Sequence, residues 1–363
     1  METSTAGLVF SSAAQRAAYS FMKAQANWEV KETTTEAQQQ SSLHAFFKDL
    51  YASIYQSPQG FGLPLTEDQS LAENESNSKE KKQVVKKLLD KPRSLINAGL
   101  DFLMLIGQQG TLEGQALYVD GYEALVKQSK VNKKFLEGLE SLGMKFTPSN
   151  GGRRIENTQY PPMMPALKTF AVRCAAYGNA SLGKAQFARC AVQAEVDTMP
   201  PAMELFYAFE GAEAERIIHL HEYFTGKGYK TEITVTAPYT WLVQYQGNRK
   251  VKASPLFQVG YDDRYTRPMR VQIKCASTGR IAPLLPGQSQ ELRDDFMSRV
   301  FRCQGDKCGW CRNKTTLGPT KMTYRGEEVI ACWYSNPDVA VLDDRMVALI
   351  KEYEQMHARL VPE

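Results

Sequence analysis

Four of the seven cysteines in this 363-residue chain lie within one stretch of thirty residues. Two of them, in Cys308-Gly309-Trp310-Cys311, have the two-residue spacing of a metal-binding knuckle, in which backbone N–H groups point toward the sulfur atoms. Four thiolates on one ion leave no coordination position for a substrate. The pattern therefore predicts a closed, structural Zn²⁺ site whose ligands are Cys303, Cys308, Cys311 and Cys332.

The fourth cysteine must be returned to the knuckle by the fold, because twenty residues separate it from Cys311. Met322 to Tyr324 and Glu327 to Ile330 have strand-like composition, and Arg325-Gly326 lies between them. A two-residue turn that contains glycine joins antiparallel strands. We therefore expect a hairpin that brings Cys332 back to the other three cysteines.

An iron–sulfur cluster is the alternative cofactor. The spacing Cys-x4-Cys-x2-Cys with a distant fourth cysteine also matches the pattern of plant-type two-iron ferredoxins. The neighbours Lys307, Trp310 and Arg312 are bulky, however, whereas a cluster loop is usually built of small residues. Reduced thiols without metal are the third interpretation. The remaining cysteines are scattered and are interpreted as small buried hydrophobes: Cys174, Cys190 and Cys275.

Basic residues concentrate in a second stretch, where Arg249 to Arg280 holds eight basic residues against two acidic ones. Aromatic residues are interleaved with them, and such a surface can neutralise phosphates and stack on unpaired bases. A nucleic acid or another anionic ligand is the partner class that this predicts. In the alternative, the aromatics face the core and the charges are solvated. The candidate contact residues are Arg249, Lys250, Lys252, Arg264, Arg267, Arg270 and Lys274.

The composition is that of an ordinary globular protein, with 43% hydrophobic and 23% charged residues and a net charge of +4. No run of about 18 apolar residues could span a bilayer, so we expect no membrane partner. The first residues lack the basic and apolar blocks of a signal peptide. Clustered cysteines without an export signal are typical of the cytoplasm.

Periodicity predicts an α+β fold with a helical N-terminal half, an antiparallel sheet region and a zinc-ribbon-like element. Helical spacing marks 43–55, 92–107, 121–128, 132–142, 166–177, 201–224, 288–301 and 339–360, and strand-like segments are 231–236, 240–246, 256–261 and 269–275. We divide the chain into a polar segment with one helix and a linker (1–80), a helical domain (81–165), an α+β domain (166–302) and the cysteine element with its C-terminal helix (303–363). Short helices before the Asn150 to Arg154 loop suggest a winged-helix-like shape for the second segment, and a small helical bundle is the alternative.

Phe301 to Pro337, with the Cys-Gly-Trp-Cys knuckle, the Gly318-Pro319 pair and the terminal cysteine, resembles the C-terminal segments of uncharacterised bacterial proteins that carry a four-cysteine cluster. Leu139 to Gly143 and Tyr160 to Met163 share this likeness. The resemblance implies a bacterial origin and a metal-binding cysteine cluster, and it transfers no catalytic residue.

Three functions fit these features. The first is an intracellular binding or regulatory protein with a structural four-cysteine zinc site, which contacts nucleic acid through the basic strand region. The second is an enzyme or redox protein that uses an iron–sulfur cluster or a reactive cysteine. The third is a scaffold that binds another protein through its helical half. No complete catalytic signature decides among them.

Overall fold

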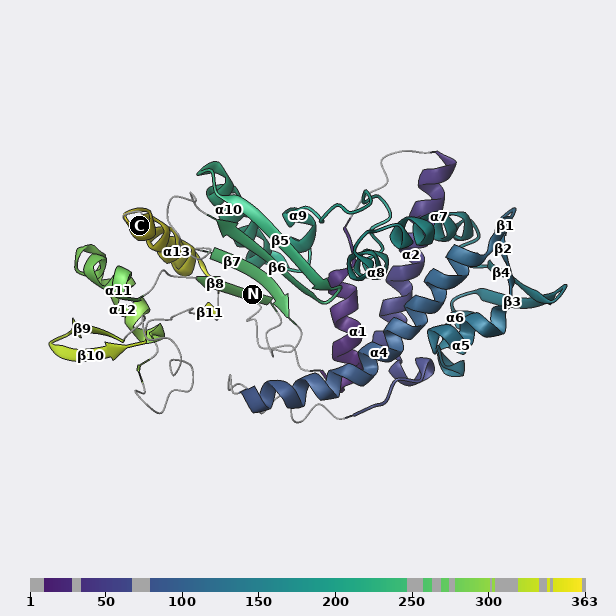
Figure 1. Cartoon of the computed structure of the whole chain (residues 1–363), viewed down its shortest axis with the longest axis horizontal. Coiled ribbons are helices and arrows are strands. Elements are labelled where there is room, and N and C mark those ends of the chain that lie inside the picture. The colour runs from purple at the N-terminus through teal and green to yellow at the C-terminus, as the bar shows by residue number, and fades with distance from the viewer. Residues whose placement is uncertain are drawn as a thin grey trace. The chain divides into compact units, whose positions relative to one another are not determined.

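The computed structural model describes residues 10–27, 34–66, 79–246, 257–262, 269–273, 278–300, 302–303, 319–332, 338–339 and 342–360 (Figure 1). The chain forms two compact units. The first comprises Met1–Ala208, Val235–Trp241 and Tyr261–Pro268, and the second comprises Phe209–Thr234, Leu242–Gly260 and Met269–Glu363. Both contain helices and strands, which confirms the α+β class. Within the described ranges, no helix has the length and apolarity needed to cross a bilayer.

This division differs from the four segments suggested by the sequence, because residues 166–208 share a unit with the helices before them. Breaks in periodicity mark loops, whereas a unit is defined by which elements bury the same apolar surface.

The first unit is mainly helical. Its helices are α1 (Ala13–Ala24), α2 (Thr35–Gln56), the short 3-10 helix η1 (Pro58–Phe61), α4 (Lys79–Gln109), α5 (Tyr122–Ser129), α6 (Lys133–Ser141), α7 (Met163–Ala175), α8 (Ala180–Ala188) and α9 (Ala202–Phe206). Thr34 starts α2 by accepting a hydrogen bond from the Ala37 N–H, as an N-cap does. The apolar residues of α2 repeat at helical spacing and are fully buried: Leu43, Phe46, Phe47, Leu50, Tyr51 and Ile54.

Helix α1 belongs to the same core although its sequence is polar and rich in small residues. Ala13, Ala14, Ala17 and Ala18 are fully buried, as is Phe21. Small side chains let two helix backbones approach closely, and the Phe21 ring adds a contact with Tyr51 of α2, with ring centroids 5.6 Å apart.

A four-stranded sheet completes the first unit. Its strands β1 (Thr111–Glu113), β2 (Ala116–Asp120), β3 (Met144–Ser149) and β4 (Gly152–Asn157) lie in the order β1-β2-β4-β3, all antiparallel. Helices α5 and α6 lie beside the C-terminal half of α4, next to this sheet (Figure 1). Helix α6 buries Phe135 and Leu139 completely, so one of its faces is fixed against the core.

A buried arginine joins three segments of the first unit. Arg189, only 1% exposed, donates to the Ala24 carbonyl at 3.1 Å, to Gln186 Oε1 at 2.7 Å and to Glu204 Oε1 at 2.8 Å. A guanidinium can be buried when a carboxylate and other acceptors accept hydrogen bonds from its N–H groups. Here the acceptors are a backbone carbonyl, an amide oxygen and a carboxylate. The contact ties the end of α1 and the start of α9 to α8.

The second unit contains most of a five-stranded sheet, while residues 235–237, 240–241 and 261–262 of its strands are grouped with the first unit. Its strands β5 (Lys230–Ala237), β6 (Thr240–Gln246), β7 (Phe257–Asp262), β8 (Met269–Ile273) and β11 (Asp338–Val339) lie in the order β11-β8-β7-β6-β5. Helix α10 (Gly211–Gly226) covers one face, where Phe224 stacks on Phe257 with ring centroids 4.9 Å apart. The opposite face carries a row of glutamines, and Gln244 Nε2 donates to Gln258 Oε1 at 2.9 Å.

The other elements of this unit are α11 (Thr278–Ile281), η2 (Ala282–Gly287), α12 (Gln290–Arg299), β9 (Thr320–Tyr324), β10 (Glu327–Ala331) and α13 (Asp344–Ala358). A buried carboxylate connects α13 to α10 and to the turn that leads into β5. Glu354, 3% exposed, accepts hydrogen bonds from Tyr223 at 2.9 Å, Lys227 at 2.8 Å and Tyr229 at 3.1 Å. One turn further along α13, the Nε2 atom of His357 is buried without a hydrogen-bond partner among the described residues.

We expect Gly99→Ala in α4 to destabilise the first unit by about 2 kcal/mol, because the packing of α6 leaves no room for a methyl group there. A Cβ at this position would lie 2.1 Å from the ring of Phe135. Urea unfolding followed by circular dichroism measures the change. Phe135→Leu removes the ring, so the double variant should lose less than the sum of the single losses. Strictly additive losses would contradict the close contact.

We expect the second unit to lose stability as the pH falls from about 6.5 to about 4. Burial, assisted by Arg280 and opposed by Glu354, lowers the pKa of His357 from 6.5 to about 4. Between these values the unfolded chain binds a proton that the folded chain does not, so acid favours unfolding by up to about 3 kcal/mol. Unfolding free energies measured at pH 7, 5.5 and 4.5 test this, and the pH dependence should be shallower in His357→Leu. Parallel pH profiles for both proteins would contradict it.

Candidate metal centre

The predicted hairpin is present and has the expected turn. Strands β9 and β10 pair antiparallel from Tyr324 and Glu327 at the turn to Thr320 and Ala331 at the open end. Arg325 and Gly326 have φ values of 51° and 82°. Positive φ at both central residues is the backbone of a type I′ turn, whose twist matches that of the flanking strands. The sequence prediction for this hairpin is therefore confirmed.

The backbone of Cys303 adds to the free edge of β10. Its N–H donates to the Ile330 carbonyl at 2.8 Å, and Arg302 forms an antiparallel bridge with Ala331. The segment before the cysteine knuckle thus pairs with the strand that leads to Cys332. These two backbone contacts bring together two cysteines that are 29 positions apart in the chain.

The pairing also bears on the face of the ladder that each cysteine occupies. Cys303 stands opposite Ile330 and shares its face of the ladder, and continued strand alternation would bring Cys332, two residues beyond Ile330, to the same face. Diagonal neighbours of this kind have Cα atoms about 7–8 Å apart. Two cysteines at that spacing can direct their sulfur atoms to one ion about 2.3 Å from each. The opposite face of β10 carries the buried residues Val329 and Ala331.

A buried hydroxyl group fixes the backbone at the fourth cysteine. Thr278, 1% exposed and the first residue of α11, donates its hydroxyl proton to the Cys332 carbonyl at 2.6 Å. This contact joins residues 54 positions apart, and no local pattern in the sequence reveals it. It holds Cys332 where β10 ends and the strand pairing no longer fixes the chain.

Helix α12 leads directly into Cys303 and is fastened to the hairpin by Asp294. This carboxylate accepts a hydrogen bond from the Tyr324 hydroxyl and pairs with the Arg325 guanidinium at 2.9 Å. Arg325 also lies over the Tyr324 ring, 5.4 Å from its centroid. The Asp294–Arg325 pair is largely exposed, so it orients the turn more than it stabilises it.

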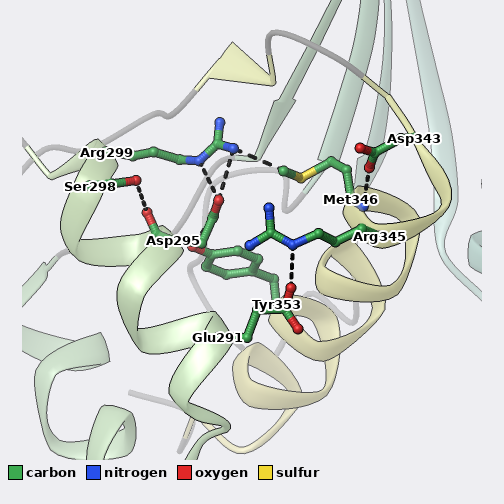
Figure 2. A network of polar contacts seen from close by, with 8 residues as sticks. All are labelled: Glu291, Asp295, Ser298, Arg299, Asp343, Arg345, Met346 and Tyr353. Carbon is green, nitrogen blue, oxygen red and sulfur yellow. Dashed lines mark hydrogen bonds and ion pairs between the residues drawn. The ribbon is translucent and has the colours of Figure 1, made fainter.

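A more buried network holds α12 on α13 (Figure 2). Asp295 accepts from Arg299 Nε and from the Tyr353 hydroxyl, each at 2.9 Å, and only 7% of its side chain is exposed. Glu291 pairs with Arg345 at the exposed end of the same helix pair. Asp343 caps α13 by accepting from the Met346 N–H at 2.7 Å. Because α12 and α13 flank the cysteine segment in the chain, this network fixes the frame from which Cys303 extends.

The other two predicted ligands, Cys308 and Cys311, lie outside the described residues. Within the ranges that the structure describes, no three His, Cys, Asp or Glu side chains gather into a metal-binding group. The structure pairs the backbone of Cys303 with Ile330, two residues before Cys332, and the four-cysteine site itself stays a prediction.

Most of the basic residues predicted to contact nucleic acid also fall outside the described ranges: Arg249, Lys250, Lys252, Arg264, Arg267 and Lys274. Arg270 lies in β8, for which the backbone is described. Three aromatics of this region, Trp241, Tyr245 and Phe257, are at most 3% exposed, so their rings have no free face on which a base could stack. These three aromatic side chains therefore belong to the apolar core.

The scattered cysteines have the environment of small hydrophobes where they are described. Cys174 and Cys190 are 1% and 0% exposed. Burial raises the pKa of the Cys174 thiol to about 12 and that of the Cys190 thiol well above its ordinary value. Both therefore disfavour the thiolate that a nucleophile or a metal ligand requires. Cys275 lies outside the described residues.

We expect Asp295→Ala to destabilise the second unit by about 2–4 kcal/mol, because it leaves the buried Tyr353 hydroxyl and the Arg299 guanidinium without this acceptor. Urea unfolding followed by circular dichroism tests the value. Ser298→Ala, in the exposed part of α12, should change the unfolding free energy by less than about 0.5 kcal/mol. Equal effects of the two substitutions would show that the network does not fasten α12 to α13.

No protein-family model matches this chain, no curated protein matches it, and no solved structure matches it. The resemblance to bacterial four-cysteine proteins thus remains a prediction, and the function must be argued from the chain's own residues.

Proposed function

We propose that Cys303, Cys308, Cys311 and Cys332 bind one structural Zn²⁺ ion. The ion closes a zinc-ribbon-like element formed by the β9–β10 hairpin and the segment that follows α12. In this proposal the protein is an intracellular binding or regulatory protein. The metal maintains the shape of the second unit and takes no part in a reaction.

One observation carries the proposal: the hydrogen bond from the Cys303 N–H to the Ile330 carbonyl, which aligns Cys303 with Cys332 on one face of β10. A zinc ribbon needs its distant ligand on a hairpin beside its first ligands, and this pairing supplies that relation. Ile330, 43% exposed, shares this face, so a knuckle folded over the two cysteines would cover an apolar side chain.

The donor set favours zinc as the occupant. Four thiolates complete a tetrahedral shell, and zinc accepts this geometry without a preference of its own. An iron–sulfur cluster is the competing cofactor with the same ligands. Zinc is favoured because Lys307, Trp310 and Arg312 are large for a loop whose amides must wrap the sulfide ions of a cluster.

The alternative functions receive less support. A reactive-cysteine enzyme would need a thiol that ionises, and the burial of Cys174 and Cys190 raises the pKa of both and opposes ionisation of either. Nucleic-acid contact through the basic strand region stays a prediction, with the Trp241, Tyr245 and Phe257 rings already engaged in packing. The scaffold hypothesis remains open for the helical unit.

We expect purified protein to contain about one zinc ion per chain and to be colourless, and Cys332→Ser to lose most of this metal. The variant should also unfold at a lower urea concentration, since metal binding contributes folding free energy. Elemental analysis and urea unfolding measure the two effects.

Cys174→Ala is the matched control, because it removes a buried cysteine of the first unit and should leave the zinc content unchanged. A brown protein with visible absorption would identify the iron–sulfur alternative. Unchanged metal content and stability in Cys332→Ser would refute a four-cysteine structural site.

A further inference from the structure

Helices α5 and α6 are joined by a tight turn of three residues, Lys130 to Asn132. Lys130 adopts a left-handed conformation with φ 60° and ψ 23°, which reverses the chain after α5. Val131 is buried, and Asn132 caps α6 by accepting from the Phe135 N–H at 2.8 Å. Two helices joined by three or four residues form a helix-turn-helix, in which the second helix can enter a DNA groove.

The elements around this turn extend the motif. Along the chain, α4 is followed by β1 and β2, then by α5 and α6, and then by the β3–β4 hairpin. In the sheet, β4 lies between β2 and β3. The hairpin therefore stands beside the helix-turn-helix as a wing, joined to it through a strand that precedes α5.

The wing is fastened to α5 by several contacts. Arg153 of β4 pairs with Glu123 at 3.2 Å and lies over the Tyr122 ring, 5.2 Å from its centroid. The Tyr118 hydroxyl donates to the Asn150 carbonyl at 2.8 Å, at the tip of the wing. These contacts come from β2, β4 and α5, so they hold the wing against the first helix of the pair.

One face of α6 is packed tightly against α4 and η1, and the opposite face is therefore exposed to solvent. Gly138 lies so close to Phe61 that a Cβ would be 2.5 Å from the ring, and Phe135 fits against Gly99 in the same way. Lys133, whose side chain is 90% exposed, and Lys134 occupy the first turn of the outer face. The start of α6 thus presents two cations to solvent.

The cations form a local cluster. Lys127, Lys130, Lys133 and Lys134 fall within eight residues, all four are exposed, and no acidic residue lies among them. Residues 121–157 together hold seven basic and four acidic residues. Three of these acids pair with cations of the same segment: Glu123 with Arg153, Glu137 with Lys133, and Glu156 with Arg154.

We propose that this surface binds double-stranded DNA. The first turn of α6 enters the major groove, and the lysines of the α5–α6 turn contact the phosphates beside it. With its side chains an α-helix is about 10–12 Å in diameter, so α6 fits across a groove about 12 Å wide. Glu140, further along α6, would repel phosphates, so the contact lies at the start of the helix. This surface belongs to the first unit and is independent of the proposed zinc site.

The test uses the full chain and a fluorescein-labelled DNA duplex of about 30 base pairs with random sequence, long enough to cover several helical turns. Fluorescence anisotropy from about 50 to about 200 mM NaCl should give a dissociation constant in the micromolar range or below at the lowest salt. Four lysine–phosphate contacts correspond to a slope of about −3.6 for the logarithm of the binding constant against the logarithm of salt concentration.

The decisive variant is Lys133→Glu combined with Lys134→Glu. It should weaken binding at about 50 mM NaCl at least about tenfold and reduce the magnitude of the salt slope by about 2. Acidic residues in the first turn favour a helix through its dipole, so α6 should remain folded. Lys86→Glu combined with Lys87→Glu is the control, because it changes the net charge equally at two exposed lysines of α4. That variant should bind within about twofold of the wild type.

Three results would overturn the proposal: no duplex binding at the lowest salt, equal weakening by the two double variants, or tighter binding to the single strands than to the duplex. If the first result is found, a protein partner is the next candidate for this surface. Cys332→Ser should bind the duplex like the wild type, so failure of the zinc site and failure of DNA binding can be told apart.

Discussion

The pairing of Cys303 with Ile330 is the contact on which the proposed metal element depends. The hydrogen bond and the neighbouring Arg302–Ala331 bridge align two distant stretches of chain at the edge of one strand. Register is decisive here, because a shift of one residue would move Cys332 to the opposite face from Cys303. The contacts that fix this register lie at some distance from the sulfur atoms: Asp294 and Thr278 hold the two ends of the hairpin, and Asp295 holds α12 on α13.

Backbone pairing alone would be a weak support for a site at the edge of a small sheet. A two-stranded hairpin is only marginally stable in water. The buried contacts of α12 and α13, and the carboxylate of Glu354 that joins α13 to α10 and to the turn before β5, connect this hairpin to a larger unit. A metal ion in this position would add its binding free energy to that of these contacts.

The first unit achieves a comparable rigidity by close packing. Glycines at 99 and 138 let α4, η1 and α6 approach until aromatic rings fill the space that a methyl group would take. Interiors packed at this density transmit strain and do not yield locally. The outer face of α6 and the wing beside it are therefore presented in one fixed arrangement, as a surface that must match a groove requires.

Local patterns in the sequence determined much of the secondary structure. The apolar spacing from Leu43 predicts α2, the strand-like segments correspond to β5 to β8, and Arg325-Gly326 predicts the turn of the hairpin, because each signal arises between residues close in the chain. Tertiary structure decided the rest. The place of α1 in the core and the grouping of 166–208 with the first unit both depend on which apolar faces meet. The contact from Thr278 to Cys332 joins residues 54 positions apart, and strand register sets the alignment of Cys303 with Cys332. Both depend on residues distant in the chain, so no local sequence pattern predicts them.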